Sequence, residues 1–435
     1  MNIAIAGTGY VGLVTAVCLA EKGHMVTCVD VDKDKVERLN KEGKALIYEQ
    51  GLDKLMQKNE QRLCYTTDYQ RAYQNADVIF IAVGTPEKKD GSANLSYVFQ
   101  VVKEIAESIV KTCVVVVKST VPIGTNEKIE KYLQAKGLED MQVGVVSNPE
   151  FLAQGSAVEN TLNASRIVIG TEEDWVKNVM LEVYHKFDAP KLITNRRSAE
   201  MIKYASNDFL ALKISYINES ANLCEEIGAD VEDVANGMGY DVRIGNKFLK
   251  AGIGYGGSCF PKDTKALHWL SNFHNHEMKT VKAAIEVNEN QKLKLIKKAK
   301  KYYESFEGLT VAILGLTFKP ETDDLREAPS LMSVPILLDD GAMVKVYDPV
   351  GMDKFKKYYP DEVCYCATIE DTIRGADLCL IFTEWEEIKQ YDVALFAKLM
   401  RKAIVLDGRN CYNLDVVRKH SLIYESIGRP VIYGQ

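Results

Sequence analysis

Long apolar runs, basic blocks and a signal segment are all missing from this sequence of 435 residues. No apolar run approaches the roughly 20 residues of a membrane-spanning helix, so we expect no membrane segment. The formal net charge is −7 and no cluster of lysine and arginine stands out, which argues against nucleic acid as the main partner. The chain passes directly from Met1 into a predicted strand, so we expect no cleavable leader.

The ten cysteines lack the spacing of a disulfide framework. Several of them, Cys113 and Cys379 among them, fall inside apolar segments, which is typical of a reduced, cytoplasmic protein. The pairs Cys364-x-Cys366 and His274-x-His276 each lack the second pair that a zinc site needs. We interpret both as structural and expect no metal.

The length and the pattern of apolar residues indicate several α/β units. Apolar residues make up 46% and charged residues 26% of the chain, as in soluble globular proteins, and 435 residues exceed one core. Up to about residue 195, short apolar strands alternate with amphipathic helices, which predicts a doubly wound, Rossmann-like parallel sheet. The predicted strands are 2–6, 25–29, 78–83, 113–118, 142–147 and 167–169.

A dinucleotide-binding fingerprint opens the chain. The first strand runs into Gly7-Thr8-Gly9-Tyr10-Val11-Gly12, an apolar helix follows, and the second strand ends at Asp30. The glycines allow a tight turn and close approach of a diphosphate to the helix N-terminus. Asp30 is placed to bind a ribose hydroxyl and would repel a 2′-phosphate, so NAD is the expected cofactor. Lys35 is either a further cofactor contact or a solvated helix lysine.

Three predicted strands end in polar loops. These loops are Val83-Gly84-Thr85-Pro86, Lys118-Ser119-Thr120-Val121-Pro122 and Ser147-Asn148-Pro149-Glu150. Because ligands bind beyond the carboxyl ends of parallel strands, we expect the three loops to converge on the site. Each taken alone could be an ordinary proline-marked turn.

The pattern becomes helical after Ser198, which we expect to cap a helix of about 30 residues that runs to Glu226. Such a helix could join domains and offer a dimer face. A second long helix is expected over 279–303. From Gly308 the α/β pattern restarts, which predicts a second Rossmann-like domain. The expected domains are 1–197 (NAD binding), 198–305 (helical, with the cysteine loop) and 306–435 (the second Rossmann-like domain).

Cys259 follows a segment with four glycines between Gly252 and Gly257 and precedes Phe260-Pro261-Lys262-Asp263. Proline is tolerated in the first turn of a helix, so Cys259 should lie at a helix N-terminus, where the dipole favours a thiolate. A nucleophilic cysteine is one interpretation, and an inert thiol in a glycine-rich turn is the other.

NAD together with a reactive thiol points to one reaction class. An alcohol can give one hydride to NAD, but the aldehyde so formed cannot give a second until a nucleophile adds to it. Addition of Cys259 would allow a second hydride to leave, and water would release a carboxylate. Lys203 and Asn207 share a helix face and are candidates for proton transfer and oxyanion stabilisation; a solvated pair is the alternative.

Over essentially its full length the sequence resembles the UDP-glucose 6-dehydrogenase family of nucleotide-sugar dehydrogenases. The resemblance is carried by the glycine fingerprint, 83–86, 119–125, 148–151, 200–204, Asn207, the Cys259 loop, 315–320, 322–327 and 407–409. It implies oxidation of UDP-glucose to UDP-glucuronate with two NAD, in a homodimer or higher oligomer. Residues 152–155 and 164–166 depart from the pattern of many bacterial members.

The resemblance also implies roles for individual positions. Cys259 matches the nucleophile, and the other catalytic positions are Lys203, Asn207, Asp263, Glu150 and Thr120. Cofactor positions are Gly7, Gly9, Tyr10, Val11, Gly12, Asp30, Lys35, Gly84, Thr85, Thr120, Lys262 and Arg326. Substrate positions are Glu150, Phe151, Leu152, Lys203, Asn207, Tyr255, Gly256 and Lys319, with Arg243 offered to a neighbouring subunit.

Three alternatives stay open on the sequence. Sister enzymes oxidise GDP-mannose or N-acetylated UDP-sugars, although the residues before Cys259 look closest to the UDP-glucose branch. A two-electron β-hydroxyacid dehydrogenase would need no thiol and would stop after one NADH. A non-catalytic NAD-binding regulator would form no NADH.

Overall fold

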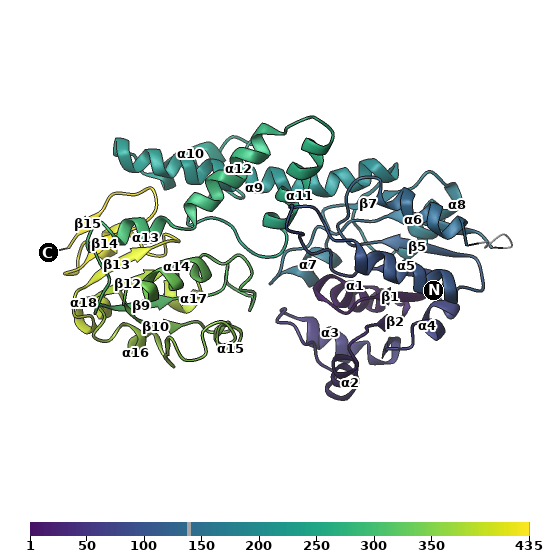
Figure 1. The fold of residues 1–435 in the computed structure, drawn as a ribbon, viewed down its shortest axis with the longest axis horizontal. Helices are drawn as coiled ribbons and strands as arrows, with labels where there is room; N and C mark the ends of the chain where they lie inside the picture. Colours follow the sequence, from purple (N-terminus) through teal and green to yellow (C-terminus); the bar gives the residue numbers. More distant parts are fainter. Residues whose placement is uncertain (137–140, 435) are drawn as a thin grey trace. The chain divides into compact units, whose positions relative to one another are not determined.

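The computed structural model describes residues 1–136 and 141–434, which form two compact units, Met1–Ser206 and Asn207–Gln435. Each unit holds one sheet with helices on both of its faces (Figure 1). The expected α/β class with two Rossmann-like sheets is confirmed. No helix in the described part of the chain is both long and apolar enough to cross a membrane.

The sheet of the first unit has the strand order β3-β2-β1-β4-β5-β6-β7-β8. All its neighbours pair in parallel except β6 and β7, which meet antiparallel at Ser147 and Gly170. The strands are β1 (Asn2–Ala6), β2 (Met25–Val29), β3 (Leu63–Thr66), β4 (Val78–Ile81), β5 (Cys113–Val117), β6 (Val143–Ser147), β7 (Ile167–Gly170) and β8 (Lys191–Thr194).

Alternate residues of these strands pack into two separate hydrophobic cores, because successive side chains of a strand point to opposite faces. Ile3, Phe80 and Val116 lie on one face, and Ala4, Ile79 and Val115 on the other. The helices are α1 (Tyr10–Glu21), α2 (Lys33–Glu42), α3 (Leu52–Lys58), α4 (Tyr69–Asn75), α5 (Ser96–Ser108), α6 (Thr125–Gln134), α7 (Ala157–Leu162) and α8 (Asp174–Val183), with a 3₁₀ turn at Glu60–Arg62.

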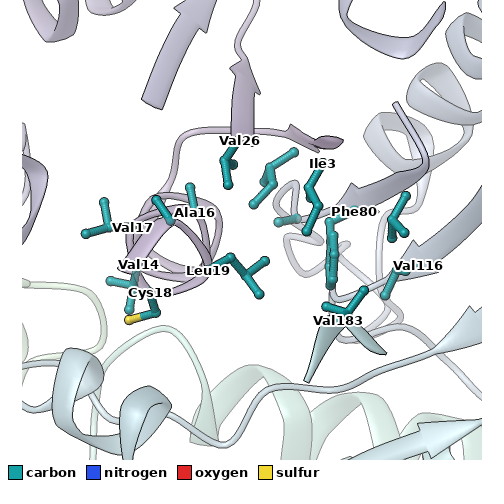
Figure 2. Packing of buried hydrophobic residues seen from close by; sticks show 14 of the residues in the cluster. Ile3, Val14, Ala16, Val17, Cys18, Leu19, Val26, Phe80, Val116 and Val183 are labelled. Carbon is teal, nitrogen blue, oxygen red and sulfur yellow. The ribbon is translucent and has the colours of Figure 1, made fainter. Parts of the chain in front are cut away.

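Helix α1 fixes the position of the glycine turn that precedes it. Every residue from Gly12 to Ala20 is buried, and the helix lies against the first core (Figure 2). Val14, Val17 and Leu19 pack in the same cluster as Ile3, Val26 and Phe80. A helix that is apolar all round must be enclosed, so its N-terminus is held at the carboxyl end of β1.

Helix α9 (Arg196–Ile227) begins in the first unit and continues into the second. The long helix is confirmed, but the expected cap at Ser198 is wrong. The backbone N–H of Ser198 donates to Asn195 Oδ1 at 2.8 Å, so Asn195 satisfies the first turn and Ser198 lies inside the helix.

The second unit repeats the plan with the strand order β11-β10-β9-β12-β13-β14-β15, parallel except for β14 and β15. Its strands are β9 (Thr310–Leu314), β10 (Met343–Tyr347), β11 (Cys364–Tyr365), β12 (Leu378–Ile381), β13 (Ile404–Asp407), β14 (Ile423–Glu425) and β15 (Ile432–Tyr433). Its further helices are α10 (Val231–Gly239), α11 (Phe260–Phe273), α12 (Lys279–Gln291), α13 (Lys294–Ala299), α14 (Pro329–Asp339), α15 (Met352–Phe355), α16 (Ile369–Ile373), α17 (Glu386–Lys389), α18 (Val393–Leu399) and α19 (Leu414–Val417).

The single long helix expected over 279–303 is wrong, because the structure divides it into α12 and α13. The break falls at Lys292 and Leu293. The fully buried amine of Lys292 pairs there with Glu289 at 2.9 Å and with Glu327 at 2.6 Å. An anchored lysine at this point fixes the end of α12.

Candidate active site

The glycine turn of the first unit is built for close backbone approach. A Cβ on Gly12 would lie 1.9 Å from the carbonyl oxygen of Gly7, so only glycine fits at this position. Gly9 precedes the first residue of α1, Tyr10, and Val11 lies in the first turn. The turn therefore leaves the N–H groups of the α1 N-terminus open to an anion such as a diphosphate.

Asp30 follows the end of β2 and is held at the same turn. Its carboxylate accepts hydrogen bonds from the backbone N–H and the hydroxyl of Thr8, from the N–H of Asp32 and from the Lys35 amine at 3.0 Å. Burial alone would raise the pKa of Asp30, but these bonds outweigh it and lower the pKa. Asp30 is thus an ionised acceptor, as a ribose hydroxyl requires, and Lys35 contacts it directly.

The loops after β4, β5 and β6 meet in the first unit, as expected for neighbouring parallel strands. The Lys118 amine in the β5 loop donates to Asn148 Oδ1 in the β6 loop at 3.1 Å. The Thr85 hydroxyl donates to the carbonyl of Thr120 at 2.8 Å, and the Ser119 hydroxyl donates to the carbonyl of Val83 at 2.7 Å. Gly84 lies exposed between these contacts. The strands themselves end slightly earlier than predicted, β4 at Ile81 and β5 at Val117.

Glu150 and Lys203 form a buried ion pair in the same unit. Lys203 Nζ lies 2.7 Å from Glu150 Oε1, and both side chains are at most 6% exposed. The second Glu150 oxygen accepts the backbone N–H of Leu152 at 2.8 Å. The ring of Phe151 lies 5.6 Å from the Lys203 amine and 3.8 Å from the Arg166 guanidinium. The sequence placed Glu150 and Lys203 in one site, and the structure joins them directly.

Cys259 occupies the N-cap position of α11, with Pro261 in the first turn. Its sulfur lies 3.7 Å from the Ser258 hydroxyl. One turn into the helix, buried Asp263 accepts a hydrogen bond from Asn207 Nδ2 at 2.6 Å and pairs with Lys262 at 2.5 Å. The second unit thus brings Asn207, Asp263 and the cysteine loop together.

Arg326 adds a positive charge near the thiol. Its two-pronged pairing with Asp324 is the main cause that raises the pKa of its guanidinium, and the negative charge of Cys259 contributes to the same shift. Because the interaction is reciprocal, Arg326 favours the thiolate of Cys259. The helix N-terminus acts in the same direction.

The glycine loop is held by side chains that the sequence did not single out. Asn288 on α12 bonds both the N–H and the carbonyl of Tyr255, at 2.7 and 3.1 Å. Asn218 on α9 and Gln291 on α12 bond the backbone of Gly252. Single amides on helices far along the chain carry no motif, so only the fold could identify them.

The remaining predicted substrate positions of the second unit cluster around Phe318. Gly257 has a φ of +81°, and a Cβ there would lie 2.7 Å from the Phe318 ring. At Gly256 a Cβ would lie 2.5 Å from the carbonyl of Glu327. The Lys319 amine lies 5.7 Å from the Phe318 ring. Arg243 stands apart, because it is exposed and its hydrogen bonds go to Asp241.

A buried acid beside Asp263 was also missed. Asp208 is 5% exposed, and neither of its carboxyl oxygens has a hydrogen-bond partner in the described part of the chain. Burial, together with the charge of Asp263, raises the pKa of Asp208 to about 8. Asp208 is therefore mostly a neutral acid at pH 7. No group of three or more metal-binding side chains occurs in residues 1–136 and 141–434.

Comparison with known proteins identifies the family. The model of the UDP-glucose/GDP-mannose dehydrogenase family matches in three parts: the NAD binding domain at residues 1–188, the central domain at 197–290 and the UDP binding domain at 312–414. The chain belongs to the UDP-glucose/GDP-mannose dehydrogenase family. It is therefore an NAD-dependent oxidoreductase. The glycine turn and ionised Asp30 fit that cofactor.

Relatives within this family match the chain from end to end. UDP-glucose 6-dehydrogenase YwqF of Bacillus subtilis is 48% identical and covers 99% of this chain and 98% of its own length. UDP-glucose 6-dehydrogenase TuaD of the same organism is 45% identical, with coverage of 100% and 94%. The solved UDP-glucose dehydrogenase of Pyrobaculum islandicum is 37% identical, has a TM-score of 0.92, and covers 98% of each chain.

Proposed function

We propose that this protein oxidises UDP-glucose to UDP-glucuronate, with two NAD and one water consumed for each sugar. The observation that carries the proposal is the position of Cys259, at the N-terminus of α11 and beside the charge of Arg326. A two-electron alcohol dehydrogenase has no use for a thiolate. Relatives named UDP-glucose 6-dehydrogenase, at 45 to 48% identity over nearly their whole length, support the choice of sugar nucleotide.

In this mechanism the thiolate acts between two oxidations. When bound, NAD supplies the hydride acceptor for each of them. In the first, the Asp263 carboxylate accepts the hydroxyl proton, while the Lys203 ammonium and the Asn207 amide stabilise the oxygen as the alcohol becomes an aldehyde. The Cys259 sulfur then bonds to the aldehyde carbon and forms a thiohemiacetal, which loses the second hydride and becomes a thioester.

Hydrolysis completes the reaction and makes it irreversible. Glu150 takes a proton from water as the water oxygen bonds to the thioester carbon, and the carbon–sulfur bond breaks to return the thiolate. Thr120 orients that water. Phe151, Leu152, Tyr255, Gly256 and Lys319 hold the substrate, and Gly7, Gly9, Tyr10, Val11, Gly12, Asp30, Lys35, Gly84, Thr85, Lys262 and Arg326 serve the cofactor.

We further propose that the working form is at least a homodimer. Phe209, Tyr216, Leu223 and Ile227 recur at spacings of seven and four along α9 and are 54 to 66% exposed. Such spacing forms one apolar stripe on a helix, and an exposed stripe of this kind marks an interface. Exposed Arg243 is then available to a neighbouring subunit. We assign NAD binding to 1–197, the cysteine loop and dimer face to 198–305, and UDP-sugar binding to 306–435.

None of the ten cysteines, all of which lie in the described part of the chain, is paired in a disulfide, so we propose a reducing compartment, the cytoplasm. The activity is tested by incubating the protein with NAD and a panel of UDP-glucose, GDP-mannose and N-acetylated UDP-sugars. Two NADH and one acid for each UDP-glucose are expected. One NADH for each sugar, or acid formed only from another member of the panel, would overturn the assignment.

A further inference from the structure

Lys118 lies directly after β5, at the start of the loop that carries Thr120. Its amine donates to Asn148 Oδ1 at 3.1 Å, and the same oxygen accepts the Tyr184 hydroxyl at 2.5 Å. Asn148 is fully buried, and its amide nitrogen donates to the carbonyl of Val168 at 2.7 Å. Asn148 stands two residues before Glu150, so Lys118 helps to hold the base of the Glu150 loop.

The charges around this loop do not balance. Glu150 is already paired with Lys203 at 2.7 Å, and Lys118 forms no ion pair with any residue in the described ranges. The partners of Lys118 are neutral: the Asn148 amide and the face of the Tyr184 ring, 5.9 Å away. One carboxylate therefore faces two lysines; Glu150 and Lys203 are buried and Lys118 is partly buried, so uncompensated charge there is costly.

The electrostatics identify Lys118 as the group that gives up a proton. Burial lowers the pKa of Lys118 to about 8; Lys203 acts in the same direction and Glu150 against it. The other titratable groups that face it are Cys18 on α1 and Tyr184 after α8. Burial raises the pKa of both, that of Cys18 to about 12, so neither is charged near pH 8.

We propose that Lys118 is a positioning residue for Glu150, which it holds through Asn148 and whose readiness to accept a proton it controls by its own charge. While Lys118 is an ammonium, two cations stabilise the Glu150 carboxylate and make it a weak base. When Lys118 is neutral, only Lys203 remains, and Glu150 takes a proton from the attacking water more readily. Thioester hydrolysis, which rests on the proposed function, then accelerates with rising pH.

The experiment compares wild type, Lys118→Arg and Lys118→Met in single turnovers at pH 7 and pH 9. The measured quantity is the rate of UDP-glucuronate release after the second NADH has formed. With a pKa of about 8, neutral Lys118 rises from about one tenth to about nine tenths of the molecules, so the wild-type rate should increase about ninefold. Arginine stays charged and should leave the rate slow at both values. Methionine is never charged, so the release rate of Lys118→Met should also be the same at pH 7 and pH 9.

Lys111→Met is the matched control, since Lys111 precedes β5 at its other end and pairs with half-exposed Asp77. It should keep the ninefold increase. The inference is overturned if the release rate of Lys118→Arg still increases about ninefold between pH 7 and pH 9. It is also overturned if both variants are slower than wild type by the same factor at pH 7 and at pH 9, because a purely structural role of Lys118 would have that effect. If methionine prevents folding, the arginine variant decides. Wild-type protein that forms no acid would instead refute the proposed function.

Discussion

The groups that we propose activate Cys259 lie far apart in the sequence. The α11 N-terminus and the Arg326 guanidinium both favour the thiolate. We expect Arg326→Met to slow alkylation of Cys259 by iodoacetamide at pH 7 by about two- to threefold, because the Arg326 side chain is 59% exposed and water screens its charge. Arg418→Met, at an exposed pair with Asp415, should leave the rate unchanged. Equal rates in all three proteins would exclude a role for Arg326 in thiolate formation.

Asp30 offers a second test on a single side chain. Its carboxylate organises Thr8 and Lys35 around the glycine turn. Asp30→Ala should weaken NAD binding by at least about tenfold, because hydrogen bonds to a charged group contribute roughly 1.5 to 3 kcal/mol. UDP-glucose binding should change little in calorimetric titrations. Asp34→Ala, an exposed change in the first turn of α2, is the control. A matching loss of affinity for both ligands would contradict the ribose role.

Helix α9 carries both proposed catalytic residues and an exposed apolar stripe. If the stripe Phe209, Tyr216, Leu223 and Ile227 forms the proposed dimer interface, Leu223→Glu should convert the dimer to monomer, because it buries a charge within that stripe. The mass in solution, measured by light scattering, should fall by half. Glu226→Gln, on the same exposed helix end, should keep the dimer. A Leu223→Glu protein of unchanged mass would show that the interface lies elsewhere.

The elements that could be predicted are those with a strong local pattern. The first strand, the glycine turn, α1 and β2 follow from apolar runs and glycine spacing, and the two strands agree with the prediction to the residue. The loops after β4, β5 and β6 met as expected, since neighbouring parallel strands end at one edge. The break at Lys292 depends on Glu327, 35 residues away, and no helical periodicity could reveal it.

The same limit explains the parts of the site that sequence reasoning missed. In the sequence, Lys118 is an ordinary residue of a turn and Asp208 is a polar helix residue next to Asn207, so nothing singles them out. Their significance comes from burial and from missing counter-charges, which depend on contacts between distant segments. Motifs identify residues that bind ligands, whereas side chains that support them become visible only in the folded chain.

For the molecule as a whole, Asp208 makes stability depend on pH. Its pKa is about 8 in the folded chain and near 3.8 when exposed, so between these values folding takes up a proton and the free energy of unfolding falls as pH rises. Asp208→Asn removes this dependence. The melting temperature of Asp208→Asn minus that of wild type should increase by roughly 6 to 12 °C between pH 5.5 and pH 8, because wild type loses about 3 kcal/mol over that range.

Scanning fluorimetry between pH 5.5 and pH 8 measures the difference in melting temperature between Asp208→Asn and wild type. Asp353→Asn, at an exposed carboxylate, is the control. A constant gap between Asp208→Asn and wild type would mean that Asp208 is ionised in the folded protein. The control should track wild type throughout, because an exposed carboxyl titrates alike in both states.

The proposed reaction requires a covalent bond between Cys259 and the half-oxidised sugar. Rapid acid quenching during turnover with UDP-glucose and NAD, followed by mass spectrometry of the peptide that contains Cys259, tests it most directly. A UDP-glucuronyl thioester on that sulfur is expected in wild type, with no adduct and no acid from Cys259→Ala. Full acid yield from Cys259→Ala, or turnover with an unmodified thiol at every time point, would contradict it.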